Sequence, residues 1–160
     1  MATLLEDIHK QSEWIVKAFA SEKFRLDFSI DSFIEIDRFF NKYVKDGKGI
    51  KGGILEKNYG PILWGIGAYV GETIIKVVPG SIWIADDDSP EGELGISVKL
   101  PGDILIWPVL RVMKRFKNGE EDSIYVYGHQ ITVEFTGAEF NSSYWDLNVN
   151  KQSKPWWKFW

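Results

Sequence analysis

The chain contains no cysteine and only two histidines in 160 residues. Without thiols it has no cysteine nucleophile, no disulfide bond and no zinc site with cysteine ligands. The formal net charge of −4 argues against a general nucleic-acid binder, which needs clustered positive charge to neutralise phosphates, and it leaves local basic patches open. The composition therefore excludes thiol enzymes and disulfide-stapled folds, and it argues against a nucleic-acid partner.

Long apolar runs are also missing. The most apolar stretch, residues 62–78, is interrupted by three glycines and by Glu72 and Lys76, so it falls short of a membrane-spanning helix. Near the N-terminus, Glu6 and Asp7 stand where a signal peptide would carry lysine or arginine. We therefore expect a cytoplasmic protein without a membrane-spanning segment, and we do not favour membrane association.

Aromatic residues are abundant, at 15% of the chain with eight tryptophans, whereas the apolar fraction of 44% and the charged fraction of 26% are typical of globular proteins. A chain of this length buries enough surface to fold as one domain without a metal or disulfide staple. We expect residues 1–137 to form a single domain. Residues 138–160 are then an aromatic-rich tail that packs on the domain or on a partner.

Apolar residues at three- and four-residue spacing predict three helices in the first half of the chain. The first spans residues 4–19, with a capping-box pattern formed by Thr3 and Glu6 at its start. The second spans residues 30–44. The third, residues 61–77, is apolar nearly all round and should be the most buried.

The second helix has acidic residues that are expected to face water, namely Asp31, Glu35 and Asp37. Residues 46–53 are rich in glycine and are expected to form a mobile surface loop, and they lack the Gly-Lys-Ser/Thr pattern of a phosphate-binding loop. Gly67 and Gly71 lie one turn apart in the third helix. We expect both to face a closely packed neighbour, either the second helix or the sheet.

Three short strands are predicted over residues 81–85, 94–100 and 104–107, followed by a helix over residues 109–116. Residues 120–135 are ambiguous, because helical spacing competes with strand-forming residues, and we favour helix. The element order is then α-α-α-β-β-β-α-α. It describes an α+β fold in which a small three-stranded antiparallel sheet packs against about five helices.

Three segments resemble an uncharacterised family of small bacterial domains, DUF3806. They are Leu26–Ser32, the segment Gly67–Ile74 with its Gly-Ala-Tyr-Val-Gly-Glu sequence, and Val112–Ser123. The resemblance implies a single cytoplasmic domain and favours helix over residues 120–135. It implies no assigned activity, although some relatives are associated with toxin–immunity loci.

Tyr69, Glu72 and His129 are the candidate ligand-binding residues. In its apolar helix, Glu72 suits a general acid or base or a ligand acceptor, and the structural alternative is a pair with a basic residue such as Arg111 or Arg115, or a cap on a neighbouring element. We expect Glu72 to be buried and hydrogen-bonded to a basic or hydroxyl group. Tyr69 shares the helix face of Glu72, so it either lines a pocket or is a core aromatic bonded to Glu72 or to backbone. No Ser–His–Asp pattern or metal spacing accompanies His129.

The remaining polar candidates favour structural interpretations. His9 falls on the polar side of the first helix and is expected to be solvated. The run from Asp86 to Asp88 lacks the alternating ligands of a calcium loop, so a solvated turn is expected. We therefore assign no catalytic residue, no metal site and no cofactor.

The last seven residues interleave lysine with large aromatic side chains. The partner-binding candidates are Trp156, Trp157, Phe159 and Trp160. Exposed aromatic area lowers solubility unless something covers it. Three interpretations remain open: the tail docks in a groove of its own domain, on a partner or second copy, or at a membrane interface.

The leading interpretation is a non-enzymatic protein-binding module that acts through a protein partner or through self-association, in a toxin–immunity setting. The alternative is a small-molecule-binding domain or a modest enzyme with a pocket around Tyr69, Glu72 and His129. The sequence leaves open whether the protein is an enzyme, and we favour the interpretation that it is not.

Overall fold

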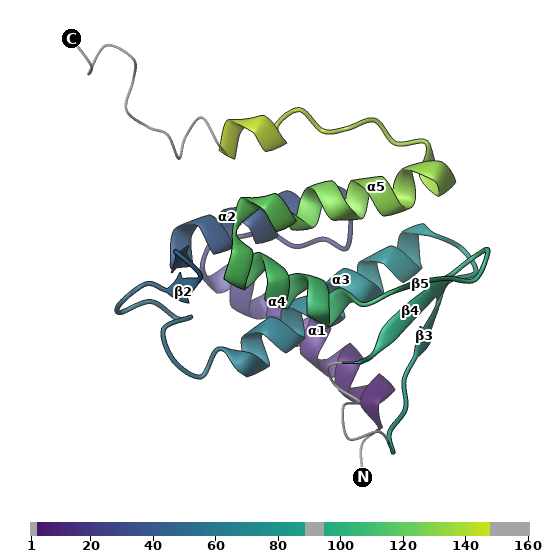
Figure 1. The fold of residues 1–160 in the computed structure, drawn as a ribbon, viewed down its shortest axis with the longest axis horizontal. Coiled ribbons are helices and arrows are strands. Elements are labelled where there is room, and N and C mark those ends of the chain that lie inside the picture. The colour runs from purple at the N-terminus through teal and green to yellow at the C-terminus, as the bar shows by residue number, and fades with distance from the viewer. Residues whose placement is uncertain (1–2, 89–94, 148–160) are drawn as a thin grey trace.

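The computed structural model describes residues 3–88 and 95–147 of the chain (Figure 1). Its fold is α+β, as predicted. The helices α1 to α5 lie in the described part, together with a further helical turn over residues 144–147, two short 3-10 helices, one three-stranded sheet and one two-stranded hairpin. In chain order the elements are α1 (Leu4–Ser21), η1 (Ile30–Ser32), α2 (Phe33–Tyr43), β1 (Val44–Lys45), β2 (Lys48–Gly49), α3 (Gly60–Val77), β3 (Ile82–Ile84), β4 (Ser97–Leu100), β5 (Ile104–Ile106), α4 (Pro108–Asn118), η2 (Glu120–Asp122) and α5 (Ile124–Thr136).

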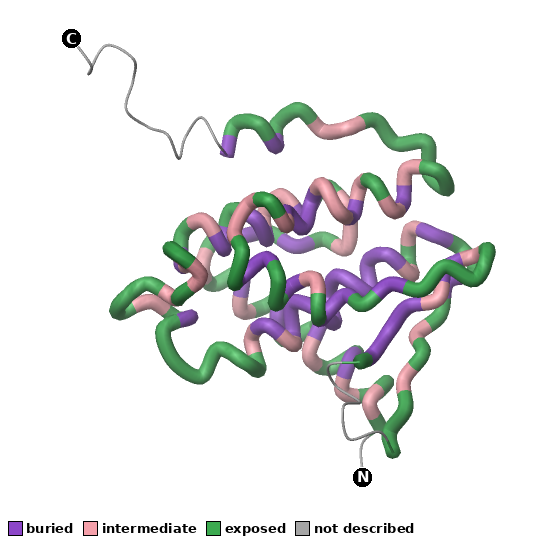
Figure 2. The backbone as a smooth tube through the Cα atoms, viewed as in Figure 1, coloured by how far each residue is buried: buried purple, intermediate pink, exposed green. Residues whose placement is uncertain are grey.

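Helix α3 forms the centre of the molecule, between α1 and α4 (Figure 1). All its residues from 65 to 74 are buried, and Figure 2 shows the burial concentrated along this helix. The all-round apolar pattern of the sequence therefore predicts its position correctly. Among the described residues, no helix has both the length and the hydropathy that crossing a membrane requires.

The three-stranded sheet lies at one end of the helical body, with strand order β3-β4-β5 and antiparallel pairing throughout (Figure 1). Trp83, Val98 and Ile106 form one cross-strand row on the face that packs against α3. Because side chains alternate between the faces of a strand, Ile82 and Leu105 belong to the opposite, outer face. The hairpin of β1 and β2 lies at the other end of the molecule (Figure 1).

Two glycines of α3 mark the points of closest packing. A Cβ on Gly67 would lie 2.7 Å from the Cα of Val109 in α4, and a Cβ on Gly71 would overlap the ring of Trp83 in β3. The expected close approach is confirmed for both positions. Gly71 faces the sheet, as predicted, but the neighbour of Gly67 is α4 and not the second helix.

The ambiguous segment 120–135 is helical from residue 124 onward. Its N-terminus is capped by the Ser123 side chain, which accepts a hydrogen bond from the backbone N–H of Val126 at 3.1 Å. Gly128 packs so closely against Phe33 that a Cβ would lie within overlap distance of the ring. Tertiary packing therefore holds this segment as a helix in spite of its strand-forming residues.

The glycine-rich loop contains structure that the sequence interpretation misses. Residues 44–49 form the hairpin β1–β2, whose turn residues Asp46 and Gly47 have φ values of 54° and 75°. Positive φ at both central positions is the geometry of a type I′ turn, for which Asp-Gly is a preferred sequence. The hairpin packs on the end of α4, because a Cβ on Gly47 would lie 2.7 Å from the backbone oxygen of Lys117.

Candidate functional site

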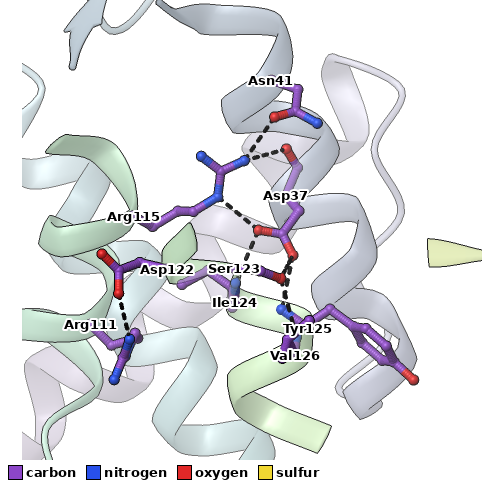
Figure 3. Close-up of polar contacts among 9 residues, drawn as sticks. All are labelled: Asp37, Asn41, Arg111, Arg115, Asp122, Ser123, Ile124, Tyr125 and Val126. Carbon is purple, nitrogen blue, oxygen red and sulfur yellow. Dashed lines mark hydrogen bonds and ion pairs between the residues drawn. The ribbon is translucent and has the colours of Figure 1, made fainter. Parts of the chain in front are cut away.

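The most extensive buried polar cluster centres on Asp37 (Figure 3). Its carboxylate accepts hydrogen bonds from Arg115 Nε and Ser123 Oγ, each at 2.8 Å. It also accepts from the backbone N–H groups of Ile124, at 3.0 Å, and Tyr125, at 2.9 Å. The side chain of Asp37 is 2% exposed, so the expectation that it faces water is wrong.

This cluster joins three helices, α2, α4 and the start of α5. Arg115, on α4, also donates through Nη2 to the backbone oxygen of Asp37 at 3.3 Å and to Asn41 Oδ1 at 2.8 Å. The carboxylate caps the first turn of α5, where unpaired N–H groups and the helix dipole favour an anion. We interpret the cluster as a structural joint, because both oxygens of the buried Asp37 carboxylate are bonded within the protein.

Glu72 lies in a second polar cluster and is 7% exposed. One carboxylate oxygen contacts Nδ1 of His9 on α1, and the other accepts a hydrogen bond from Trp83 Nε1 at 3.4 Å. The prediction that Glu72 is buried and hydrogen-bonded is confirmed. The partners proposed for it are wrong, because Arg111 and Arg115 pair with other carboxylates.

His9 is exposed, as expected, with 64% of its side chain accessible, but sequence reasoning misses its contact with Glu72. A carboxylate bonded to Nδ1 fixes the orientation of an imidazole ring, which is one requirement of a general base. No serine or threonine hydroxyl contacts the His9 ring within the described part of the chain, so a nucleophile is lacking there. Through Glu72, these contacts link α1 to α3 and to β3. They do not form a set of catalytic residues.

Tyr69 is fully buried beside the segment that leads into α2. Its hydroxyl accepts a hydrogen bond from the backbone N–H of Phe28 at 2.8 Å and shares one with Ser32 Oγ at 2.6 Å. Burial raises the pKa of Tyr69 above its ordinary value, and these hydrogen bonds offset the rise only in part. The contacts favour the core-aromatic interpretation.

His129 lies on α5, where its Nε2 is 3.1 Å from the backbone oxygen of Ala138. Its ring packs edge-on against Phe140, with 5.3 Å between ring centroids. Across the described residues, no hydrogen bond or ring contact joins any two of Tyr69, Glu72 and His129. The three candidates therefore occupy three separate surroundings.

Other acidic residues also have structural partners. Asp87, in the turn after β3, accepts a hydrogen bond from the backbone N–H of Leu4 at 2.7 Å and so caps the start of α1. In residues 3–88 and 95–147, no three histidine, aspartate or glutamate side chains come together in a way that could hold a metal ion.

A groove of about 650 Å³ lies between α1, the start of α3 and α4. Most of its lining is apolar, and Asp7 and Gln11 supply its polar atoms. The apolar residues are Tyr59, Pro61, Leu63, Trp64, Val109 and Met113, with Gly60 between them. This groove has no counterpart among the sites predicted from sequence.

A smaller pocket, of about 260 Å³, lies between β5, α4 and α5. Three of its lining residues are large, apolar and exposed: Leu105 at 44%, Trp107 at 42% and Leu110 at 39%. We call these three residues the β5–α4 patch. Ile82 and Ile84, at 54% and 44% exposure, lie on the same outer face of the sheet but on β3, and Ser97 and Lys99 of β4 separate them from the patch.

The sequence signal for this patch was present but was interpreted only as a strand and a helix start. Residues 104–107 are all large and apolar, although an edge strand with one solvated face normally alternates apolar with polar side chains. That missing alternation indicates that β5 exposes apolar side chains at the edge of the sheet.

No family model matches the chain, and no curated protein or solved structure matches it either. The resemblance to DUF3806 therefore stays an expectation. The tail candidates Trp156, Trp157, Phe159 and Trp160 lie outside the described residues.

Proposed function

We propose that the chain is a cytoplasmic protein-binding domain without enzymatic activity, and that the β5–α4 patch is its docking surface. The observation that carries this proposal is the exposure of Leu105, Trp107 and Leu110 around one pocket. Clustered exposed apolar side chains are typical of protein interaction sites, and tryptophan is enriched among the residues that dominate binding energy.

The position of the patch also supports binding. β5 is an edge strand that pairs only with β4 among the described strands, so one side of its backbone is open to further pairing. No helix of the described chain covers the outer face of the sheet in Figure 1. A partner can therefore contact the strand edge, the sheet face and the start of α4 together.

The enzyme alternative has less support. Polar atoms of Tyr69, Glu72 and His129 are already bonded to other protein groups, and the three residues do not surround a common pocket. A substrate would have to displace these contacts before chemistry could begin. The toxin–immunity setting stays an expectation from the resemblance.

Affinity capture from the source cell tests the proposal when it is run with matched variants. Leu110→Asp places a charge in the patch, and Ile54→Asp makes the same kind of change at a residue of similar exposure, 41% against 39%, in the segment after β2. That segment lies at the opposite end of the molecule from the sheet (Figure 1). Equal thermal midpoints would show that both variants fold.

We expect a partner that is retained by the wild type and by Ile54→Asp, and that is lost from Leu110→Asp by about tenfold or more, as for a residue central to an interface. Capture of the same proteins in equal yield by Leu110→Asp would contradict the assignment of the docking surface.

A further inference from the structure

We infer that the β5–α4 patch receives a segment of a partner protein that combines apolar side chains with carboxylates. This inference rests on the proposed protein-binding function and names the chemistry of the partner.

The charges around the pocket point to such a segment. Its lining includes two cationic side chains, Arg111 and Lys114, and no acidic one. Arg111 is held in place by Asp122, with Nη1 2.9 Å from Oδ1, and its guanidinium lies 4.4 Å from the ring centroid of Tyr127. Lys114 forms no ion pair with any described residue. The ammonium of Lys114 is therefore free to meet a carboxylate.

This rim has two cations and no acidic residue, whereas in the pocket beside the hairpin β1–β2 the cations Lys45, Arg115 and Lys117 are accompanied by Asp46 and Glu120. The net charge of the chain is −4, and the groove on the other flank of α4 is lined by one acidic residue, Asp7, and no cation. On the outer sheet face, Lys99 is already paired with Asp103 at 3.0 Å. An acidic segment is therefore attracted to the cations of the patch, and electrostatic complementarity of this kind selects partners.

Tyr127 adds a hydrogen-bond donor to the same pocket. Burial raises its pKa to about 12, and the neighbouring Arg111 opposes this rise only in part. A phenol keeps its proton at neutral pH even at its ordinary pKa, so this hydroxyl is a hydrogen-bond donor within the lining of the pocket. Leu105, Trp107 and Leu110 supply the apolar floor on which the other side chains of the segment pack.

Selection from a random peptide library displayed on phage, with the full chain as bait, tests the inference. We expect enriched peptides to contain more aspartate and glutamate than the unselected library, together with large apolar residues. Their affinity, measured with synthetic peptides, should fall about tenfold or more for Leu110→Asp. It should fall about three- to tenfold for Lys114→Glu, since charge reversal replaces an exposed attraction by a repulsion.

Lys17→Glu is the matched control, because it changes the net charge equally at an exposed lysine on α1. Affinity should change less than twofold in this variant, because its charge lies outside the contact. Peptides that need Leu110 but are neutral or basic, or that bind Lys114→Glu as tightly as wild type, would overturn the inference and leave the proposed function standing. Absence of any peptide that needs Leu110 would overturn both.

Discussion

Replacing Gly67 by alanine tests the packing of the central helix. The added Cβ would lie 2.7 Å from both the Cα and the Cγ2 of Val109, whereas ordinary contacts begin at 3.4 Å. The Cα belongs to the backbone of α4 and cannot rotate away. Helix α4 must therefore move by about 0.7 Å relative to α3, against an interior that is packed as densely as an organic crystal.

The cost of this movement exceeds the benefit of alanine. Overpacking typically costs 1–3 kcal/mol, and alanine gains about 1 kcal/mol over glycine in helix propensity. The upper half of the first range applies here, because α4 also carries Arg115 and its displacement strains the joint with Asp37. We expect a net loss of about 1–2 kcal/mol and a thermal midpoint roughly 2–8 °C lower.

Differential scanning calorimetry of Gly67→Ala and Gly60→Ala provides the measurement. Gly60 is the first residue of the same helix, and a Cβ there would have no neighbour within 4 Å. Its replacement should leave the midpoint unchanged or raise it. A midpoint for Gly67→Ala at or above that of Gly60→Ala would refute the argument for close packing against α4.

Asp37→Ala leaves the buried guanidinium of Arg115 without its carboxylate, and it should lower the free energy of unfolding, measured in urea, by about 3–5 kcal/mol. Glu35→Ala breaks a surface pair on the same helix and should lower this free energy by about 1 kcal/mol or less. Similar losses in the two variants would contradict the structural role of Asp37. Gly71→Ala should lower the thermal midpoint, because its Cβ would overlap the Trp83 ring, and an unchanged midpoint would rule out that contact. The pKa of Tyr127 is raised from 10.0 to about 12, so the folded protein holds the phenol proton more tightly than the unfolded chain does. The contribution of this group to the free energy of unfolding is therefore fully present below about pH 10 and is lost as the pH rises to about 12. Urea unfolding at about pH 9 and about pH 11 should therefore show a steeper loss for wild type than for Tyr127→Phe, and equal losses would disprove the shift.

Helices were predictable where one face of the helix is buried, because apolar residues then recur at three- and four-residue spacing in the sequence. The same spacing contained the signal for Asp37, which lies four residues after Phe33 and three before Phe40, on the buried stripe of α2. The charge was taken as evidence of exposure, although a buried charge with several partners is stable. Its partner Arg115 is 78 residues away, so no local pattern identifies the pair.

The hairpin β1–β2 was missed for a different reason. The Asp46-Gly47 pair is a strong signal for a type I′ turn, but the strands on either side have only two residues each. Strands so short show no alternation, and the many glycines of the segment indicated a loop instead.

Prediction of the candidate site was limited by distance along the chain. The apolar surroundings of Glu72 in the sequence were enough to predict its burial. Its partner His9 is 63 residues earlier, and the contact depends on how α1 packs against α3. The separation of Tyr69 from His129 likewise follows from helix packing, which periodicity does not specify.

During synthesis, Asp37 leaves the ribosome long before the groups that neutralise it, since Arg115 and Tyr125 follow by 78 and 88 residues. Until those groups emerge, the nascent α2 carries an acid in the middle of its apolar stripe, and burying that face would leave a charge unpaired. We therefore expect the first three helices to remain open on the nascent chain and accessible to chaperones. The buried face of α2 can then pack only after α4 and the first turn of α5 have been synthesised and can bond to Asp37.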